Sequence, residues 1–270
     1  LELNDYKRNA PKVSEGFIEA AKFLKEQRIF SARDLPYTTQ LIPMAVLFAL
    51  LGNKTQDAVV KEKIARWYWS GVLGEMYGSA NETRYANDIT EVMPWIEDGK
   101  VEPDTVSRAY FNPIRLLSLQ TRQSAAYKGI MALILQAGAK DFISGSKMDF
   151  IVFLDENTDI HHIFPKAYCE KQYIERTKWN SIVNKTPIFA RTNRIIGGSP
   201  PSNYLKKMEE AGHVNSEQVN EFVSSHKIDV QAMRNDDFVS FFIKRAKSLL
   251  NLIGTAMGKT IAERDNDEII

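Results

Sequence analysis

The spacing of hydrophobic residues changes at Gly145-Ser146, and this change constrains the fold more than any other feature of the chain. Before it, apolar residues recur at the spacing of amphipathic helices. After it, short apolar runs containing β-branched residues predict strands, and helical spacing then returns. We therefore expect a mainly α fold, in which a helical body carries a small strand–strand–helix insert.

The predicted helices before Gly145 follow from apolar faces and helix-start signals. Leu41–Leu51 is apolar nearly all round, as a buried helix would be. Ser79 to Glu82 has the spacing of a capping box and predicts the start of another helix. The run Trp67-Tyr68-Trp69 is expected to pack in the core. Further helices are expected at 14–26, around 60–67 and at 124–137.

The insert is predicted from three apolar runs and a proline–glycine pair. Candidate strands are 148–154, 158–164 and 186–190. A helix should begin at Pro200-Pro201 and end at Gly212, since Pro favours the first turn and Gly the end. Helices at 215–226 and 229–257 should follow. The predicted domains are 1–147, a helical region; 148–212, the insert; and 213–270, C-terminal helices packing on the body.

The net charge of +1 conceals a basic segment within an acidic chain. Residues 161–207 hold nine Lys or Arg and two Asp or Glu, a balance of +7, so the remainder carries −6. Such a segment predicts a polyanionic partner, although a solvated surface is the alternative reading.

The sequence argues against several other classes of protein. Cys169 is the single cysteine, which excludes internal disulfides and cysteine-based zinc sites, and no HExxH motif is present. The longest apolar run is too short to cross a bilayer, so no membrane association is expected. The chain starts at Leu1 without a basic-then-apolar leader, and we expect it to be part of a longer polypeptide.

Two adjacent histidines, His161 and His162, end one of the predicted strands. Neighbouring side chains on a strand point to opposite faces, so the pair is not expected to bind one metal together. One imidazole could bind a cation while the other takes a proton from water, which is the combination that phosphodiester hydrolysis requires.

The residues that follow extend this pattern. Asn184 lies about twenty residues after the histidine pair, and Asn193 lies nine residues after Asn184. The run from His161 to Pro165, with Asn184, Asn193 and Lys207, resembles the HNH (ββα-metal) nucleases. It is most similar to the HNH region at the C-terminal end of GmrSD-like restriction and phage-defence proteins, which degrade DNA. The motif covers residues 159–207, and the segment 77–84 resembles the helices that precede this nuclease in the same family.

The resemblance implies a role for each matching residue. His161 becomes the first metal ligand, in a place that is often acidic, and His162 becomes the general base. Asn184 becomes the structural asparagine whose amide bridges the loop backbone and holds His162. Asn193 becomes the second protein ligand, and Asp159 is a candidate to orient a metal-bound water. The implied cofactor is one divalent ion, Mg²⁺ or Mn²⁺, with Ni²⁺ or Zn²⁺ as alternatives because imidazole suits transition ions.

The expected partner is DNA. Arg191, Arg194, Lys206 and Lys207 are candidates to contact backbone phosphates. The loop residues Lys171, Tyr173, Arg176 and Trp179 are candidates to follow the groove. The resemblance also implies an upstream nucleotide-dependent regulatory domain in the same polypeptide and a cytoplasmic, bacterial setting.

Two other functions fit parts of the same pattern. A module that keeps the finger's shape could bind DNA without cutting it, although His162 and both asparagines are present. An iron oxygenase would use Asp159, His161 and a distant histidine, but it needs the reverse order of ligands and a β-sandwich. His213 and His226 lack partners at ligand spacing and are expected to be structural, and Cys169 is expected to be a packed thiol.

Overall fold

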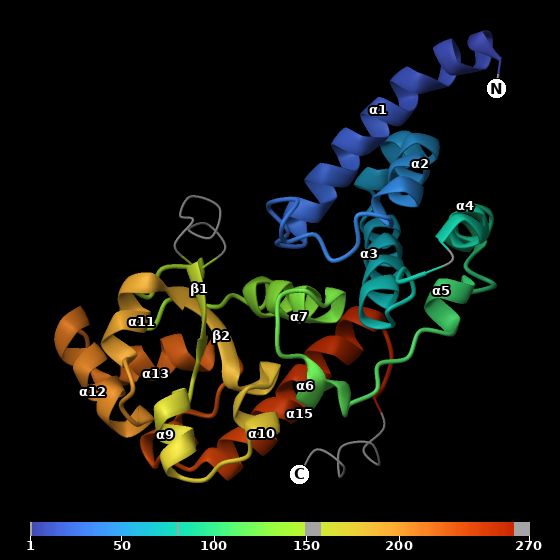
Figure 1. Cartoon of the computed structure of the whole chain (residues 1–270). Helices are drawn as coiled ribbons and strands as arrows, with labels where there is room; N and C mark the ends of the chain where they lie inside the picture. The colour runs from blue at the N-terminus through green and yellow to red at the C-terminus, as the bar shows by residue number, and fades with distance from the viewer. Residues whose placement is uncertain (1, 80, 149–157, 262–270) are drawn as a thin grey trace. The chain divides into compact units, whose positions relative to one another are not determined.

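The fold is mainly α, as the sequence predicts. The computed structural model describes residues 2–79, 81–148 and 158–261. The described residues are mainly helical and contain a single sheet of two antiparallel strands (Figure 1). The predicted strand at 148–154 falls almost wholly on 149–157, which lie outside the described residues.

The described residues form two compact units. The first comprises those of Leu1–Phe111 and Thr255–Lys259, and the second those of Asn112–Gly254 and Thr260–Ile270. This division differs from the predicted domains 1–147, 148–212 and 213–270. The segment from Asn112 and the C-terminal helices up to Gly254 group with the strands, because long-range polar and aromatic contacts described below tie them together.

The first unit is built from helices. Leu41–Leu51 is helical over the predicted range, and the first helix starts well before the predicted residue 14. The α1 and α2 backbones approach so closely that a Cβ at Gly16 would lie 2.1 Å from the carbonyl oxygen of Ala45. The elements are α1 (Leu3–Glu26), α2 (Leu41–Leu51), η1 (Gly52–Gln56), α3 (Ala58–Leu73), α4 (Asn81–Asp98) and α5 (Asp104–Ser107).

Aromatic side chains of α3 form the core of the first unit. Trp67, Tyr68 and Trp69 are all buried, which confirms the prediction that this run packs in the core. The buried Tyr77 hydroxyl donates a hydrogen bond to Asp88, which also accepts one from Thr105 at 2.6 Å. Burial raises the pKa of the Asp88 carboxyl.

The second unit surrounds the two strands with helices. Its elements are α6 (Arg115–Ser118), α7 (Ala125–Gln136), β1 (Thr158–His162), α9 (Lys166–Lys171), α10 (Arg176–Trp179), η2 (Ile182–Asn184), β2 (Lys185–Phe189), α11 (Ala190–Ile196), α12 (Pro201–Gly212), α13 (Ser216–Ser224), α14 (Val230–Arg234) and, up to Gly254, α15 (Phe238–Met257).

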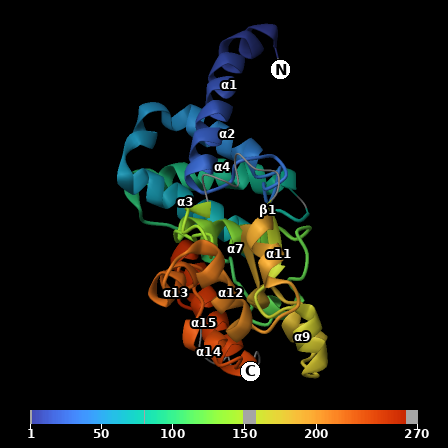
Figure 2. The ribbon, with the colours of Figure 1, turned by 90° about the vertical axis from the view of Figure 1, so that its left-hand side faces the viewer.

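The sheet and the helix after it form a strand–strand–helix unit. Thr158 pairs with Phe189 at one end of the sheet, and His162 pairs with Lys185 at the other. Helix α11 begins directly after β2 and contacts both strands, and α12 then contacts α11 (Figures 1 and 2). The two strands and α11 therefore have the ββα order that the sequence predicts.

The C-terminal helices complete the core around the strands. Phe164 packs against Phe238 and Phe241 of α15, with ring centroids 5.3 and 4.8 Å apart. The buried guanidinium of Arg245 donates to the carbonyl oxygens of His226 at 2.5 Å and Lys185 at 3.0 Å. These contacts are the physical reason that α15 groups with the strands up to Gly254.

The predicted helix 229–257 is interrupted in the structure. Asp236 lies between α14 and α15 with a φ of +53°, in the left-handed region. Its carboxylate accepts hydrogen bonds from the backbone amide of Ser202 at 2.8 Å and the Ser202 hydroxyl at 2.6 Å. The break thus orients a side chain that holds the start of α12.

Candidate active site

The adjacent histidines lie at the end of β1. His161 is opposite Thr186 and His162 is opposite Lys185 in the register of the two strands. The two imidazole centroids are 6.5 Å apart with their planes inclined by 71°. Successive residues of a strand face opposite sides of the sheet, so the two rings have different surroundings and can serve different functions.

Asn184 bridges the backbone on either side of the site. Its Oδ1 accepts from the amide of Phe164 at 2.8 Å, and its Nδ2 donates to the carbonyls of Phe164 at 2.9 Å and Trp179 at 2.8 Å. The side chain is fully buried, so each of these bonds satisfies a polar group that water does not reach. These bonds match the bridging role that the resemblance implies for Asn184, and they fix the backbone two residues after His162.

His162 lies in a partly buried, positively charged environment. Its Nε2 is 3.2 Å from Oδ1 of Asn180, and its ring centroid is 5.5 Å from that of Trp179. Burial lowers the pKa of the imidazole, and the positive charges of Lys185 and Lys166 lower it further, whereas the bond to Asn180 raises it. The net direction keeps the ring neutral at neutral pH, which a proton acceptor requires.

Lys185 contributes a buried ammonium group beside His162. Its Nζ donates to the carbonyl oxygen of Gln120 at 2.7 Å. Burial lowers the pKa of this amine to about 8. The sheet register places Lys185 directly across from His162, so its charge acts on that ring over a short distance.

Helix α11 carries the second predicted metal ligand, Asn193. Because α11 contacts β1, Asn193 belongs to the helix that packs against the strand of His161. Buried Asp141 holds the start of this helix by accepting from the Thr192 hydroxyl at 2.7 Å and the Phe189 amide at 3.4 Å. The side chain of Asp159 lies outside the described part of the structure, and its backbone pairs with Ile188 in the sheet.

The two residues expected to hold a metal, His161 and Asn193, come from β1 and α11. The Nε2 atom of His161 is buried, and the amide of Asn193 offers an oxygen from α11. No cluster of three His, Cys, Asp or Glu side chains occurs within the described residues. The two candidate ligands thus lie on β1 and on α11, the helix that contacts it.

The candidate phosphate contacts lie on the surface of α11 and α12. Arg191 and Arg194 are exposed on α11, and Lys206 and Lys207 are exposed on α12, which contacts it. In the preceding loop Tyr173 is 95% exposed. The prediction that Trp179 follows a DNA groove is wrong, because this side chain is 6% exposed and packs against the ring of His162.

The two histidines outside the pair have different environments. His226 is fully buried, with Nε2 2.7 Å from the Lys140 carbonyl and Nδ1 2.6 Å from the Thr186 hydroxyl. Both ring nitrogens are occupied by protein groups, which confirms the structural role predicted for His226. His213 is exposed at the end of α12. Cys169 is buried and its pKa is raised to about 12 by burial, as a packed thiol requires.

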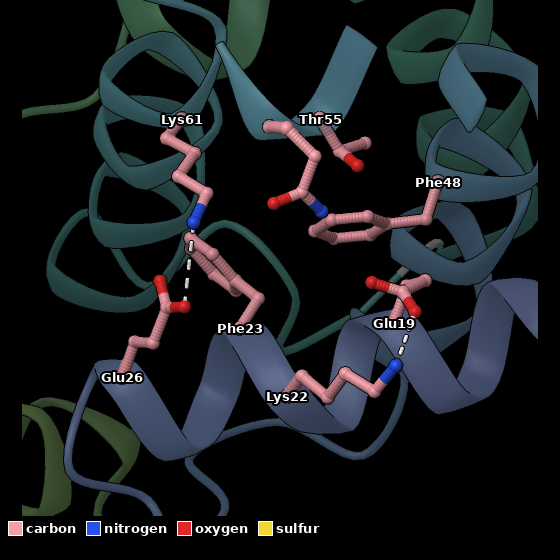
Figure 3. Close-up of a pocket in the computed structure, with 8 residues that line it drawn as sticks. Glu19, Lys22, Phe23, Glu26, Phe48, Thr55 and Lys61 are labelled. Atoms are coloured by element: carbon pink, nitrogen blue, oxygen red, sulfur yellow. Dashed lines mark hydrogen bonds and ion pairs between the residues drawn. The ribbon is translucent and has the colours of Figure 1, made fainter. Parts of the chain in front are cut away.

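The first unit contains a pocket that no histidine lines. It has a volume of about 310 Å³ and lies between α1, α2, η1 and α3 (Figure 3). Its charged side chains pair with one another, Lys22 with Glu19 at 2.6 Å and Lys61 with Glu26 at 3.4 Å. In the second unit, by contrast, the described residues include histidine, amide and lysine side chains that lie close together.

Comparison with known proteins adds one relative. The chain is 30% identical over 216 residues to an uncharacterised protein of Methanocaldococcus jannaschii, an alignment that covers 75% of this chain and 36% of that protein. The chain therefore spans about a third of the length of that curated relative. No protein-family model matches the chain, and no solved structure matches it significantly. None of the described helices has the length and hydropathy needed to cross a bilayer.

Sequence reasoning missed several residues around the histidine pair. Asn180 contacts His162 at the end of β1, Lys185 pairs with His162 across the sheet, and Asp141 contacts the start of α11. Gln120, which lies outside the motif, contacts Asn180 and Lys185. Polar residues of these types are common on surfaces, and no spacing rule links position 120 or 141 to residues beyond 160. For Lys185 there is a local signal, because it directly follows Asn184 in the sequence.

Proposed function

We propose that this chain is a metal-dependent endonuclease of the HNH type that hydrolyses DNA phosphodiester bonds. The observation that carries the proposal is the ββα unit with His162 at the end of β1. One ring nitrogen of His162 contacts Asn180, and Asn184 accepts a hydrogen bond from the backbone amide of Phe164. A positioned imidazole kept neutral beside a basic surface suits proton abstraction from water next to a phosphate.

His162 acts as the general base in this proposal. It takes a proton from a water molecule as the water oxygen forms a bond to phosphorus and the bond from phosphorus to the 3′ oxygen breaks. The products are a 5′-phosphate and a 3′-hydroxyl, whose proton comes from solvent. Asn184 keeps the backbone of the strand end fixed, so that the imidazole does not have to be ordered during the reaction.

His161 and Asn193 would hold the divalent cation. When bound, such an ion neutralises charge on the phosphate and on the leaving oxygen, which is Lewis-acid catalysis. An imidazole in place of the more common carboxylate favours a transition ion such as Mn²⁺ or Ni²⁺ over Mg²⁺. Asp159, on the same strand as His161, is the candidate to orient a water at this ion.

DNA is the proposed substrate because exposed cations lie on the two helices that follow β2. Arg191, Arg194, Lys206 and Lys207 contact phosphates in this proposal, and phosphate contacts position DNA without reading its sequence. The chain would be the effector part of a longer restriction or anti-phage protein, in which an upstream nucleotide-dependent domain controls cleavage.

The test is incubation of the chain with supercoiled plasmid and Mg²⁺, Mn²⁺, Ni²⁺ or EDTA. We expect nicked or linear DNA with at least one cation and intact plasmid with EDTA. DNA that is bound but never cut with any cation would instead support a catalytically inactive binding module. Absence of both binding and cleavage would contradict the proposal as a whole.

A further inference from the structure

A chain of hydrogen bonds leads from His162 to a residue far outside the motif. Nε2 of His162 is 3.2 Å from Oδ1 of Asn180, and Nδ2 of Asn180 donates to Oε1 of Gln120, also at 3.2 Å. Gln120 lies between α6 and α7, 42 positions before His162. All three side chains are partly buried.

The order of donors and acceptors along this chain determines the tautomer of His162. An amide oxygen only accepts hydrogen bonds, so Oδ1 of Asn180 requires a hydrogen on Nε2 of the imidazole. The lone pair of the neutral ring then lies on Nδ1. Among the described residues Nδ1 has no hydrogen-bond partner, and it is not one of the buried polar atoms. The proton-accepting nitrogen is thus the one that solvent reaches.

Gln120 keeps the Asn180 amide in this orientation. If the amide of Asn180 turned over, its NH₂ group would face Nε2 of His162 and the opposite tautomer would be favoured. The bond from Nδ2 to Oε1 of Gln120 opposes this rotation, because both amides would have to turn over together to keep it. The backbone oxygen of Gln120 is in turn held by Nζ of Lys185, the residue that pairs with His162 across the sheet.

We propose that Gln120 and Asn180 are positioning residues that fix His162 as the Nε2–H tautomer, with Nδ1 as its proton acceptor. The catalytic consequence rests on the proposed nuclease function, whereas the tautomer itself does not. The active histidine is accordingly oriented by the segment between α6 and α7, and residues 148–212 alone would lack that support.

The tautomer can be measured directly by ¹⁵N NMR of the His162 ring in the full chain. The sample contains EDTA and is held at about pH 8, where imidazole is ordinarily neutral. We expect wild type to show a protonated Nε2 and an unprotonated Nδ1. Gln120→Leu should allow a mixture of tautomers, whereas Gln120→Glu should retain a single one, because its carboxylate still accepts from Asn180. Gln123→Leu, an exposed change in the same loop, is the matched control.

Cleavage rates provide the second readout. Gln120→Leu should lower kcat by roughly 10- to 100-fold, as small misplacements of a catalytic group do, with DNA affinity unchanged, and Gln120→Glu should restore most of the rate. A wild-type ring protonated on Nδ1, or a Gln120→Leu protein with the wild-type tautomer, would overturn the proposal. If the tautomer behaves as expected in a protein that cuts no DNA, the nuclease function fails and the positioning inference stands.

Discussion

The two asparagines of the candidate site differ in what surrounds them at the scale of single residues. Asn184 is fully buried and makes three hydrogen bonds to the backbone of Phe164 and Trp179. Asn193 is partly exposed on α11. A buried bridge of this kind contributes to folding, whereas the role proposed for Asn193 is to bind a cation.

Substitution of Asn184 should therefore affect stability first. Asn184→Ala removes three buried hydrogen bonds and leaves the Phe164 amide and the Trp179 carbonyl without this partner, and each such loss costs about 1–3 kcal/mol. We expect a lower midpoint of denaturant unfolding whether or not a divalent ion is present. An unchanged midpoint would contradict the bridging role.

Substitution of Asn193 should affect metal binding first. Asn193→Ala removes a proposed ligand, so metal affinity measured by calorimetry should fall and excess Mn²⁺ should partly restore cleavage. Unfolding without metal should stay close to wild type, because α11 keeps Asp141 at its start. If Asn184→Ala and Asn193→Ala respond in the same way to added metal, the assignment of separate roles is incorrect.

At the scale of elements, buried His226 connects β2 to the segment after α7. Its Nε2 donates to the Lys140 carbonyl, so its Nδ1 must accept from the Thr186 hydroxyl, and the ring has to be neutral to do both. Burial lowers the pKa of His226 to about 3, and the positive charge of Arg245 contributes to the same direction.

This histidine should make the fold sensitive to acid. The unfolded chain binds a proton at His226 below its ordinary pKa of about 6.5, whereas the folded chain does not until about pH 3. Stability is therefore fully present above about pH 6.5 and falls as the pH decreases toward 3, by at most about 1.4 kcal/mol per pH unit for this single proton.

The check is denaturant unfolding of wild type and His226→Gln at several pH values between 7 and 4. The variant should be less stable at pH 7 and should show a shallower loss of stability on acidification. His213→Asn, which replaces an exposed histidine at a left-handed position that asparagine tolerates, is the control. Identical pH slopes for wild type and His226→Gln would contradict the account.

A helix or strand can be predicted from the sequence when the residues that determine it lie close together in the chain. Leu41–Leu51 follows from its continuous apolar run and the helix at 124–137 from apolar periodicity, and both are present close to their predicted bounds. The strands at 158–162 and 185–189 were located within about two residues of their ends, which is the usual uncertainty of such boundaries. The break at Asp236 was missed because its partner, Ser202, is distant in the sequence.

The candidate site likewise contains residues that a local motif predicts and residues that contact it from far along the sequence. The motif from His161 to Asn193 includes Asn184, whose bridging bonds link residues close in the sequence. Gln120, Asp141 and Arg245 were missed because they contact the strands and α11 from 40 or more positions away, as in the bond from Asp141 to Thr192. The predicted domain boundaries were displaced for the same reason, since these contacts join the surrounding helices to the strands.

At the scale of the whole molecule, the asymmetric charge leads to an expectation about selectivity. The basic segment at 161–207 should bind DNA mainly through phosphates, which carry no sequence information. We expect affinity for unrelated duplexes to be similar and to fall steeply with salt, with a log–log slope of roughly −0.9 for each phosphate neutralised. Selectivity for modified or foreign DNA is expected instead from the upstream domain that is part of the proposed function.

This expectation can be tested by removing four charges from the basic surface. The quadruple change to Gln at Arg191, Arg194, Lys206 and Lys207 should make the salt slope shallower by up to roughly four units and weaken binding equally for all duplexes. The control removes four exposed charges of the first unit by changes to Gln at Lys7, Lys12, Lys54 and Lys100. A strong preference of the chain for one duplex, insensitive to salt, would contradict the expectation.

The central claim is that His162 takes a proton from water during metal-dependent cleavage of DNA. Its most direct test is the single-turnover rate of plasmid cleavage by wild type, His162→Ala and the control His213→Asn, with the activating cation and with EDTA. We expect His162→Ala to lower the rate by roughly 10²- to 10⁴-fold. Its circular dichroism and DNA affinity should stay close to wild type, and His213→Asn should cleave normally. Cleavage by His162→Ala within about threefold of wild type, well short of the smallest loss expected for a general base, would contradict the claim.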